Sequence, residues 1–157
     1  GDVYEGSFRN DMKEGRGRMT FHNGDQYVGE FRYDQMTGTG TMTYANGNVY
    51  TGDFKAGRRH GTGSLRFANG DLYKGEFVRG VRQGKGLYVF RGGARYIGEF
   101  KNDRREGQGR YVYASGEEYV GGFKEGRKEG VGVCIYADGR RLKGFWEDDQ
   151  FARPIDG

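Results

Sequence analysis

Polar and apolar residues alternate along two stretches of a unit that recurs every 23 residues. Across residues 3–9, Tyr, Gly and Phe fall on one side of the alternation and mostly polar residues on the other. Residues 38–44 of the next unit alternate in the same way. A period of two is typical of a β-strand with one buried face. Each unit is therefore predicted to supply two strands that form a β-hairpin.

Glycine and aromatic residues keep the same positions from one unit to the next. Glycines at positions 1, 6, 15 and 17 of the unit, with two more in the last unit, account for 26 of the 32 glycines. Position 4 is Tyr and position 8 is Phe in all six complete units. A fixed period of this length is typical of repeat architectures, in which each unit buries its face against its neighbours. We expect an all-β fold: an elongated, single-layer antiparallel β-solenoid of stacked 23-residue hairpins.

Most units are joined by an Asn-Gly or Asp-Gly dipeptide, as at Asn23-Gly24 and Asp138-Gly139. These dipeptides favour type I′ turns, which need a positive φ at both central residues. The sequence therefore predicts a tight turn between units and a polar loop of five or six residues within each unit. Repeated one after another, such hairpins form one long antiparallel sheet.

The glycines at positions 6, 15 and 17 are predicted to share one face with the Tyr and Phe residues. A missing side chain leaves room for a ring to lie across the neighbouring strand and lets the sheet bend. We therefore expect a curved sheet with an aromatic groove on its concave face. The expected groove aromatics are Tyr27, Phe31, Tyr50, Phe54, Tyr73, Phe77, Tyr96 and Phe100.

The pattern Tyr-x-Gly-x-Phe, followed after six residues by Gly-x-Gly, resembles the MORN (membrane occupation and recognition nexus) repeat, as in residues 27–31 and 38–40. The resemblance covers residues 1–146, and within the family the chain is most similar to the all-repeat cytoskeletal MORN proteins of protozoan parasites. It implies a cytoplasmic scaffold at the cytoskeleton or at a membrane face. It also implies cytoskeletal protein partners, phosphoinositide headgroups as further ligands, and capture of a partner peptide in the groove.

The repeats divide the chain into six complete units, residues 1–138, and an atypical seventh, residues 139–157, expected to act as a C-terminal cap. In the seventh unit Leu142 replaces Tyr, Trp146 replaces Phe, and Pro154 lies in the segment that replaces Gly-x-Gly. Whether this unit completes its second strand stays open. Atypical terminal repeats are typical of caps, and Pro cannot donate to a continuing ladder. We expect the array to end here and, because the chain opens at a unit boundary without Met, to continue upstream.

Basic residues recur in the loop predicted within each unit, in a chain of net charge +4. Along one edge of the sheet they would attract anionic lipid, at about 1 kcal/mol per basic residue near the surface, or an acidic partner. Alternatively they are solubilising loop charges, softened by Glu106 and Glu129. Nucleic acid is disfavoured, because the aromatic residues occupy repeat positions and are not free to stack on bases. The expected basic edge is Arg58, Arg59, Arg82, Arg104, Arg105, Arg127 and Lys128.

No catalytic or metal-binding constellation is recognised in the sequence. His22 and His60 lie in different units without a zinc spacing. Gly-x-Gly lacks the third glycine and the following helix of a nucleotide-binding loop, which favours structural glycines. The single Cys134 excludes an intramolecular disulfide and matches core hydrophobes of other units, which favours burial over a redox role. We expect no enzyme activity and no cofactor, and no apolar run is long enough for a transmembrane helix.

Outward-facing positions become apolar near the C-terminal end of the repeats. Val131, Val133 and Ile135 occupy positions that are Arg or Thr in the first two units, and Phe145 extends the apolar surface. A single-layer sheet has no second layer to cover such a face, so we expect a two-fold homodimer. The alternative is that residues 151–157 fold back over the face as a cap. The expected dimer interface is Val131, Val133, Ile135, Leu142, Phe145, Trp146 and Phe151.

Overall fold

A computed structural model describes residues 1–155, which form fourteen β-strands and, within that range, no helix. The strands belong to one antiparallel sheet in which their order in space is their order in the chain, which confirms the all-β, single-layer antiparallel fold. Asp156 and Gly157, the end of the expected cap, lie outside the described residues. The strands are β1 (Val3–Arg9), β2 (Met12–Thr20), β3 (Gln26–Arg32), β4 (Gln35–Thr43), β5 (Val49–Lys55), β6 (Arg58–Arg66), β7 (Leu72–Val78), β8 (Val81–Val89), β9 (Arg95–Lys101), β10 (Arg104–Val112), β11 (Glu118–Lys124), β12 (Arg127–Ile135), β13 (Arg141–Glu147) and β14 (Gln150–Pro154).

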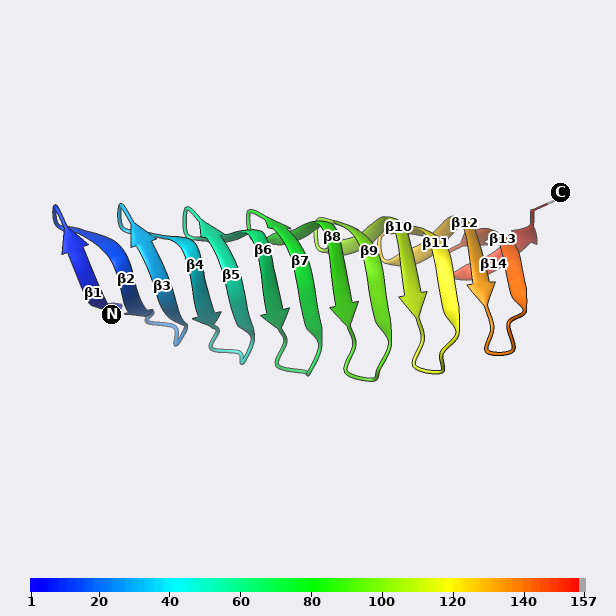
Figure 1. Ribbon diagram of the computed structural model, residues 1–157, viewed down its shortest axis with the longest axis horizontal. Coiled ribbons are helices and arrows are strands. Elements are labelled where there is room, and N and C mark those ends of the chain that lie inside the picture. Colours follow the sequence, from blue (N-terminus) through cyan, green and yellow to red (C-terminus); the bar gives the residue numbers. More distant parts are fainter. Residues whose placement is uncertain (156–157) are drawn as a thin grey trace. The chain divides into compact units, whose positions relative to one another are not determined.

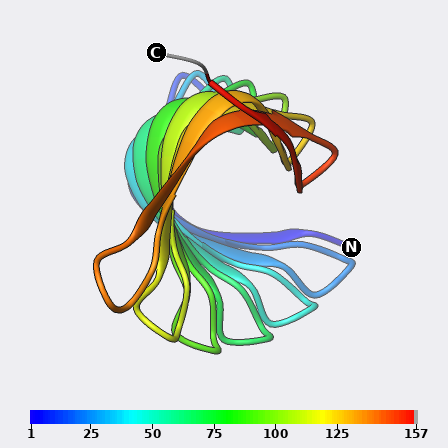
Figure 2. The ribbon, with the colours of Figure 1, turned by 90° about the vertical axis from the view of Figure 1, so that its right-hand side faces the viewer.

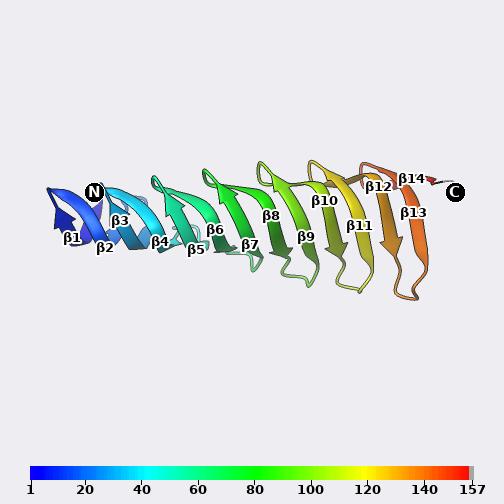
Figure 3. The ribbon, with the colours of Figure 1, turned by 45° about the horizontal axis from the view of Figure 1, so that its top comes forward.

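The chain divides into two compact units, each of which contains several of the 23-residue repeats. The first unit is Gly1–Val81 and the second unit is Arg82–Gly157. In the first unit, β1 to β7 pair one after another; in the second, β8 to β14 do the same. Within each unit, successive hairpins lie side by side (Figures 1 and 3). The individual strands are strongly bent, as Figure 2 shows, so that each hairpin curls over one of its own faces.

The connections between strands differ from the prediction in type and in place. Within the second repeat, Tyr33 and Asp34 form a two-residue turn with φ values of 51° and 68°, so the type I′ geometry lies inside the repeat. Between repeats, Gly24 N–H donates to the Phe21 carbonyl at 3.0 Å, and within this connection only Gly24 has a positive φ, of 100°. That geometry is a three-residue loop with a bulge. The predicted polar loop is therefore reduced to the turn at Tyr33 and Asp34, and its remaining residues are strand, since β4 begins at Gln35.

A β-bulge interrupts the pairing within the hairpins at the glycine of position 15. Between β3 and β4 the register shifts after Gly29, and Gly38 has a φ of 59°, which glycine adopts without steric cost. At the equivalent Gly15, an added Cβ would have only the Ser7 Cβ within 4 Å, at 3.9 Å. The prediction that position 15 makes room for rings is therefore wrong: this glycine permits the backbone conformation of the bulge.

Carboxylates at position 7 bond the backbone of the bulge from the face opposite the rings. Glu30 Oε2 accepts the Thr39 N–H at 2.6 Å and the Thr39 hydroxyl at 2.9 Å, and these bonds lower the pKa of Glu30. Asp53 Oδ2 accepts the Thr62 N–H at 3.0 Å in the next repeat. The acidic residue at this position therefore has a structural role in fixing the bulge.

The glycines at positions 6 and 17 do make room for tyrosine rings. At the cross-strand pair Gly29–Gly40, a Cβ on Gly29 would lie 2.5 Å from both the Gly40 Cα and the Tyr27 hydroxyl oxygen. A Cβ on Gly40 would enter the Tyr27 ring itself. Because real Cβ atoms do not approach other atoms so closely, only glycine fits beneath each ring.

Tyr27 shows how a position-4 tyrosine is held, by its own strand and by two phenylalanines. The Tyr27 hydroxyl donates to the Glu30 carbonyl at 2.9 Å. Its ring meets Phe31 at 5.1 Å and Phe54 of the next repeat at 4.9 Å, both edge to face. Such pairs contribute about 0.5–1.5 kcal/mol each beyond the burial of area, and within each unit they join successive hairpins. The side chains that occupy this position with 0 % exposure are Tyr27, Tyr50, Tyr73, Tyr96 and Tyr119.

The seventh hairpin completes its second strand, since β14 pairs with β13 along its length. Trp146 takes the Phe position, is 5 % exposed, and donates its Nε1–H to the Gly132 carbonyl at 3.1 Å. Its ring meets Tyr119 at 5.3 Å and Phe151 at 5.4 Å, so Phe151 closes the aromatic series. Pro154 stands opposite Gly144 at the end of the last described strand, where the missing N–H costs no ladder bond.

We expect Gly63→Val to destabilise the first unit, because a Cβ on Gly63 would enter the ring of Tyr50. Overpacking of this kind costs about 1–3 kcal/mol. The matched control is Gly92→Val, since Gly92 has no positive φ and an added Cβ there has nothing within 4 Å. The melting temperatures of both variants are measured by circular dichroism during heating. Equal melting of Gly63→Val and the parent chain would refute the ring-over-glycine packing.

The buried tyrosines predict a loss of stability at alkaline pH. Burial raises the pKa of Tyr27 and of Tyr119 from 10.0 to about 12. Because the folded-state pKa lies above the unfolded one, this stabilisation is complete below pH 10 and is lost as the pH rises towards 12. Denaturant titrations across that range should show the free energy of unfolding falling. Tyr27→Phe should reduce the slope by about one proton. Full tyrosinate absorbance that develops before any β-structure is lost would contradict this expectation.

Candidate interaction surfaces

The two faces of each unit have different chemistry. The aromatic face carries the buried Tyr and Phe rows, and the opposite surface is named the outer face. Cross-strand pairing assigns residues to them: Phe54 stands opposite Arg59, while Lys55 stands opposite Arg58. Since consecutive strand residues point to opposite faces, Arg59 belongs to the aromatic face and Arg58 to the outer face.

The eight expected groove aromatics form the core of the aromatic face, and not its accessible lining. The four tyrosines among them are 0 % exposed and the four phenylalanines at most 5 % exposed. Of these, Phe100 still reaches the wall of a cavity described below. The expectation that these rings line an open groove is therefore corrected, because the rings pack edge to face against one another.

A second aromatic row, missed in the sequence, provides the accessible lining. Position 21 of every complete repeat is aromatic and half-buried, and in the second unit Tyr88 and Tyr111 add rings at position 19. Ring centroids are 4.6 Å apart for Tyr88 and Phe90, 5.7 Å for Phe90 and Tyr111, and 4.7 Å for Tyr111 and Tyr113. The same 23-residue period was the signal that could have revealed this row. Its position-21 members are Phe21, Tyr44, Phe67, Phe90, Tyr113 and Tyr136.

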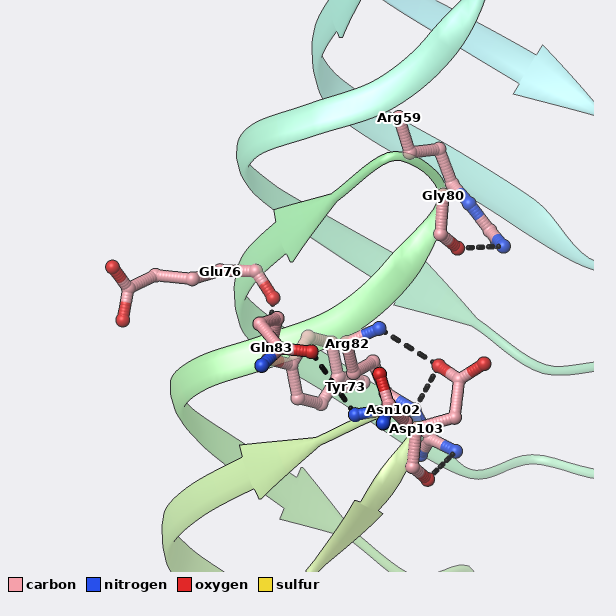
Figure 4. A network of polar contacts seen from close by, with 8 residues as sticks. All are labelled: Arg59, Tyr73, Glu76, Gly80, Arg82, Gln83, Asn102 and Asp103. Carbon is pink, nitrogen blue, oxygen red and sulfur yellow. Dashed lines mark hydrogen bonds and ion pairs between the residues drawn. The ribbon is translucent and has the colours of Figure 1, made fainter.

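Cations at position 13 lie between the two aromatic rows. The Arg105 guanidinium is 5.3 Å from the Tyr111 ring and 5.6 Å from the Phe123 ring, and its Nη2 donates to the Gly126 carbonyl at 2.5 Å. In the first unit Arg59 donates in the same way to the Gly80 carbonyl at 2.7 Å (Figure 4). Each cation therefore ties its hairpin to the turn of the next one. Burial raises the pKa of Tyr44, and the nearby Arg59 opposes that shift.

Arg82 makes the corresponding contacts in the second unit. Its Nη2 donates to the Asp103 carbonyl at 2.7 Å and its Nε lies 3.2 Å from the Asp103 carboxylate (Figure 4). Beside this pair, the Asn102 N–H donates to the Gln83 side-chain carbonyl at 3.0 Å. These bonds fix the two-residue turn between β9 and β10 against β8.

The expected basic edge is therefore two rows on opposite faces. Arg58, Arg104 and Arg127 are exposed on the outer face, whereas the position-13 cations are half-buried among the rings. The outer row is interspersed with acids: Arg127 lies 3.4 Å from Asp148, and the Glu106 carboxylate accepts the N–H of Glu125 at 2.7 Å. The half-buried members are Arg59, Arg82, Arg105 and Lys128.

Two neighbouring cavities open on the aromatic face of the second unit. The first, of about 220 Å³, is walled by Tyr88, Phe90 and Phe100, with Arg82, Asp103, Arg104, Arg105 and Gly126 completing the lining. The second, of about 240 Å³, is lined by Arg105, Tyr111, Tyr113, Phe123, Lys128 and Asp149. We name them the Tyr88 cavity and the Tyr113 cavity. Arg105 belongs to both, so they are adjacent and one repeat apart.

The expected dimer interface is likewise divided between the faces. Val131 pairs with Phe145 and Val133 with Lys143 on the outer face, as Ile135 does with Arg141. Leu142, Trp146 and Phe151 belong to the aromatic face, where Trp146 is buried. The C-terminal tail forms β14 beside β13, and over the outer face it contributes Arg153, whose guanidinium is 4.3 Å from the Phe145 ring.

Ile97 and Val120 add to the apolar surface on the outer face of the second unit, although the sequence did not point to them. Each is 42 % exposed, beside Val131 of the expected dimer interface, which is 48 % exposed. The pairs Arg110–Ile97, Arg110–Val120 and Val120–Val133 link them across β9 to β12. We name this surface the outer apolar strip: Ile97, Val120, Val131, Val133 and Phe145.

Reactive groups on these surfaces are few. Cys134 is half-buried opposite Tyr119, and burial raises the pKa of its thiol, which lowers its thiolate fraction. Residues 1–155 contain no group of three or more His, Cys, Asp or Glu side chains placed to hold a metal ion. Over the same residues, no helix has the length and apolar character needed to cross a membrane.

Comparisons with solved structures identify a related fold. The TCP domain of SAS-4 (dCPAP) from Drosophila melanogaster, solved in complex with a proline-rich motif of Ana2 (dSTIL), is 16 % identical, with a TM-score of 0.55 over 83 % of this chain and 72 % of that one. The TCP10 domain of Danio rerio CPAP, solved with a peptide of STIL, is 14 % identical, with a TM-score of 0.39 over 92 % of this chain and 70 % of that one. At such identities the first match shows the fold alone. No curated protein matched the chain.

The family comparison covers most of the chain. A model of the MORN repeat matches residues 4–26, 27–49, 50–72, 73–95, 96–118 and 119–140. These matches begin at each position-4 tyrosine, the residue around which the glycine contacts and the Phe pairs are built. The chain therefore belongs to the MORN-repeat family.

Proposed function

We propose that the chain is a non-enzymatic scaffold that self-associates through the outer apolar strip and holds protein partners on its aromatic face. Its place is the cytoplasm, at the cytoskeleton or at a membrane face, and the cytoskeletal MORN proteins of protozoan parasites are its expected counterparts. The observation that carries the proposal is the strip itself. Its five apolar residues lie on the strands β9 and β11 to β13 of a sheet with no second layer among the described residues, and Ile97, Val120 and Val131 are exposed.

The composition of the strip at the positions of Val131, Val133 and Phe145 differs from the same surface of the third repeat. The positions of Val131 and Val133 are Thr62 and Ser64 in the third repeat, and the position of Phe145 is Asp53 there. The fold therefore accepts polar residues at these positions, and the apolar ones in the second unit need another reason. Contiguous exposed apolar patches mark interaction sites. A two-fold contact between two copies of the strip is the commonest closed solution.

Self-association is tested by replacing the strip with residues that the chain itself uses. The variant Val131→Thr, Val133→Ser, Phe145→Glu should sediment as a folded monomer, whereas the parent chain sediments as a dimer at tens of micromolar. Val28→Thr is the matched control: Val28 is also exposed on the outer face, at 40 %, but in the first unit. A parent chain that sediments as a monomer at tens of micromolar would refute the proposed self-association.

Partner binding on the aromatic face is supported by two observations. The position-19 and position-21 rings of the second unit are half-buried, and the cavities beside them combine aromatic walls with cations. In addition, the TCP domain with a related fold was solved in complex with a proline-rich motif. A bent single-layer sheet of this kind therefore supports a role in holding a segment of another protein.

Phosphoinositide or other anionic-lipid recognition is the second candidate function. It is favoured by cation pairs that face each other across the turns, Lys55 with Arg58, Lys101 with Arg104 and Lys124 with Arg127. All six are exposed. Basic residues near an anionic surface contribute about 1 kcal/mol each, although the neighbouring acids reduce the sum.

Lipid binding predicts a specific effect of charge reversal. Arg58→Glu, Arg104→Glu, Arg127→Glu should abolish flotation with phosphoinositide-containing liposomes. Added salt should weaken binding by the parent chain, since exposed charges are screened beyond about 8 Å at physiological ionic strength. Arg66→Glu, Lys74→Glu, Arg95→Glu makes the same charge change at exposed residues away from the turns and should retain binding. Equal loss in both variants, or binding indifferent to salt, would rule out the turn cations as the lipid site.

A further inference from the structure

The Tyr88 and Tyr113 cavities repeat with the period of the hairpins. Each repeat contributes two strands, and strands in a sheet lie about 4.8 Å apart, so equivalent points recur roughly every 9.6 Å across the strands. Both cavities have the same construction: a cation at position 13, rings at positions 19 and 21, and the Phe at position 8 of the next repeat. A ligand that fills both must present similar groups at that interval.

The period distinguishes between the regular conformations of a peptide. A polyproline II helix has three residues per turn and a rise of about 3.1 Å, so one face recurs every 9.3 Å or so. An extended strand presents one face about every 6.7 Å. An α-helix presents one face at its 5.4 Å pitch, so two turns span about 10.8 Å and exceed the interval of the cavities. Only the polyproline II repeat coincides with the repeat of the cavities.

The lining has the chemistry that such a segment requires. Polyproline II leaves its carbonyls without internal hydrogen bonds, and aromatic-lined grooves bind its preformed rings at low entropic cost. The Tyr113 hydroxyl accepts a hydrogen bond from Lys128 Nζ at 2.6 Å, so its own O–H remains a donor. Arg105 uses Nη2 for the Gly126 carbonyl, and a guanidinium has five N–H donors. The walls therefore offer flat apolar surfaces next to donors.

Charge restricts the residues between the prolines. Three cations on the aromatic face line the two cavities, Arg82, Arg105 and Lys128, against two carboxylates, Asp103 and Asp149. One of these, Asp103, is already paired with Arg82. The surplus of positive charge favours neutral or acidic residues at the intervening positions.

We propose that the aromatic face of the second unit binds a proline-rich, neutral-to-acidic segment in polyproline II conformation. The segment runs across the strands with a proline at every third residue, one in the Tyr88 cavity and one in the Tyr113 cavity. This proposal rests on the aromatic face being the partner surface of the proposed function, and it specifies the conformation, register and charge of the partner.

The test uses two fluorescent twelve-residue peptides, each with three prolines and with the same numbers of Glu and Ser. The prolines are three residues apart in the first peptide and four residues apart in the second, which moves the second proline out of register by about 3.1 Å and turns it by a third of a circle. Fluorescence anisotropy with the full chain should show the first peptide binding about tenfold or more tightly than the second.

The chain offers its own fold-neutral substitutions for this site. Tyr88 and Tyr111 correspond to Met42 and Leu65 in the first unit, so Tyr88→Met, Tyr111→Leu removes the two rings while keeping residues that the fold uses there. This variant should lose affinity for the register peptide about tenfold. The control is Tyr33→Asn, which removes a 63 % exposed ring at a turn position that is Asn in the first repeat, and it should bind normally.

Every outcome of the test is decisive for the proposal. Preference for the register peptide that is lost in the double variant and kept in Tyr33→Asn supports it. Equal binding of both peptides, with loss in the double variant, overturns the register but leaves the aromatic face as a partner surface. Absence of binding, or equal losses in the double variant and the control, overturns the proposal outright. None of these results bears on self-association, which the ultracentrifuge measures separately.

Discussion

A tyrosine ring lying against glycine backbone is the contact on which the rest of this structure depends. A single-layer sheet has no opposing layer to cover its apolar side chains, yet five of the six position-4 tyrosines are 0 % exposed. The glycines at positions 6 and 17 allow the ring to lie flat on the neighbouring strand, and the hydroxyl is satisfied by a carbonyl three residues away. Phenylalanines from the same and the next repeat then close over the ring. Each repeat thus completes the core of its neighbour, which is how linear repeat proteins gain stability.

The bulge and the two-residue turn decide to which face of the sheet the charged side chains point. The turn places positions 8 and 13 opposite each other on the aromatic face and positions 9 and 12 opposite each other on the outer face. Consecutive basic residues such as Arg104 and Arg105 therefore have different roles. Arg105 packs between rings and ties two hairpins together, whereas Arg104 faces solvent.

The two units share this core and differ in what they show on either side of it. In the second unit the aromatic face gains the rings of Tyr88 and Tyr111, and the outer face gains Val131, Val133 and Phe145. The equivalent positions carry other residues in the first unit, such as Met42 and Thr62, so the fold accepts different side chains there. A core fixed by glycine and aromatic residues, with variable positions beside it, suits a family of interaction proteins. The surfaces proposed for self-association and for partner binding both lie at such variable positions.

The sequence by itself determined the features that repeat locally: the hairpin unit, the antiparallel sheet, the MORN-repeat family, and the room that glycine at positions 6 and 17 makes for rings. These follow from periodicity, because a pattern found six times has one structural reason. Which residues face outwards was decided only by the tertiary structure. Positions 12 and 13 were expected in a loop, but the tight turn makes them strand, and alternation then sends Arg58 and Arg59 to opposite faces. The same alternation separates Phe145 from Trp146 and divides the expected dimer interface. The eight expected groove aromatics became core because the bent hairpins and the neighbouring Phe rings cover them, a consequence of packing that no single repeat contains.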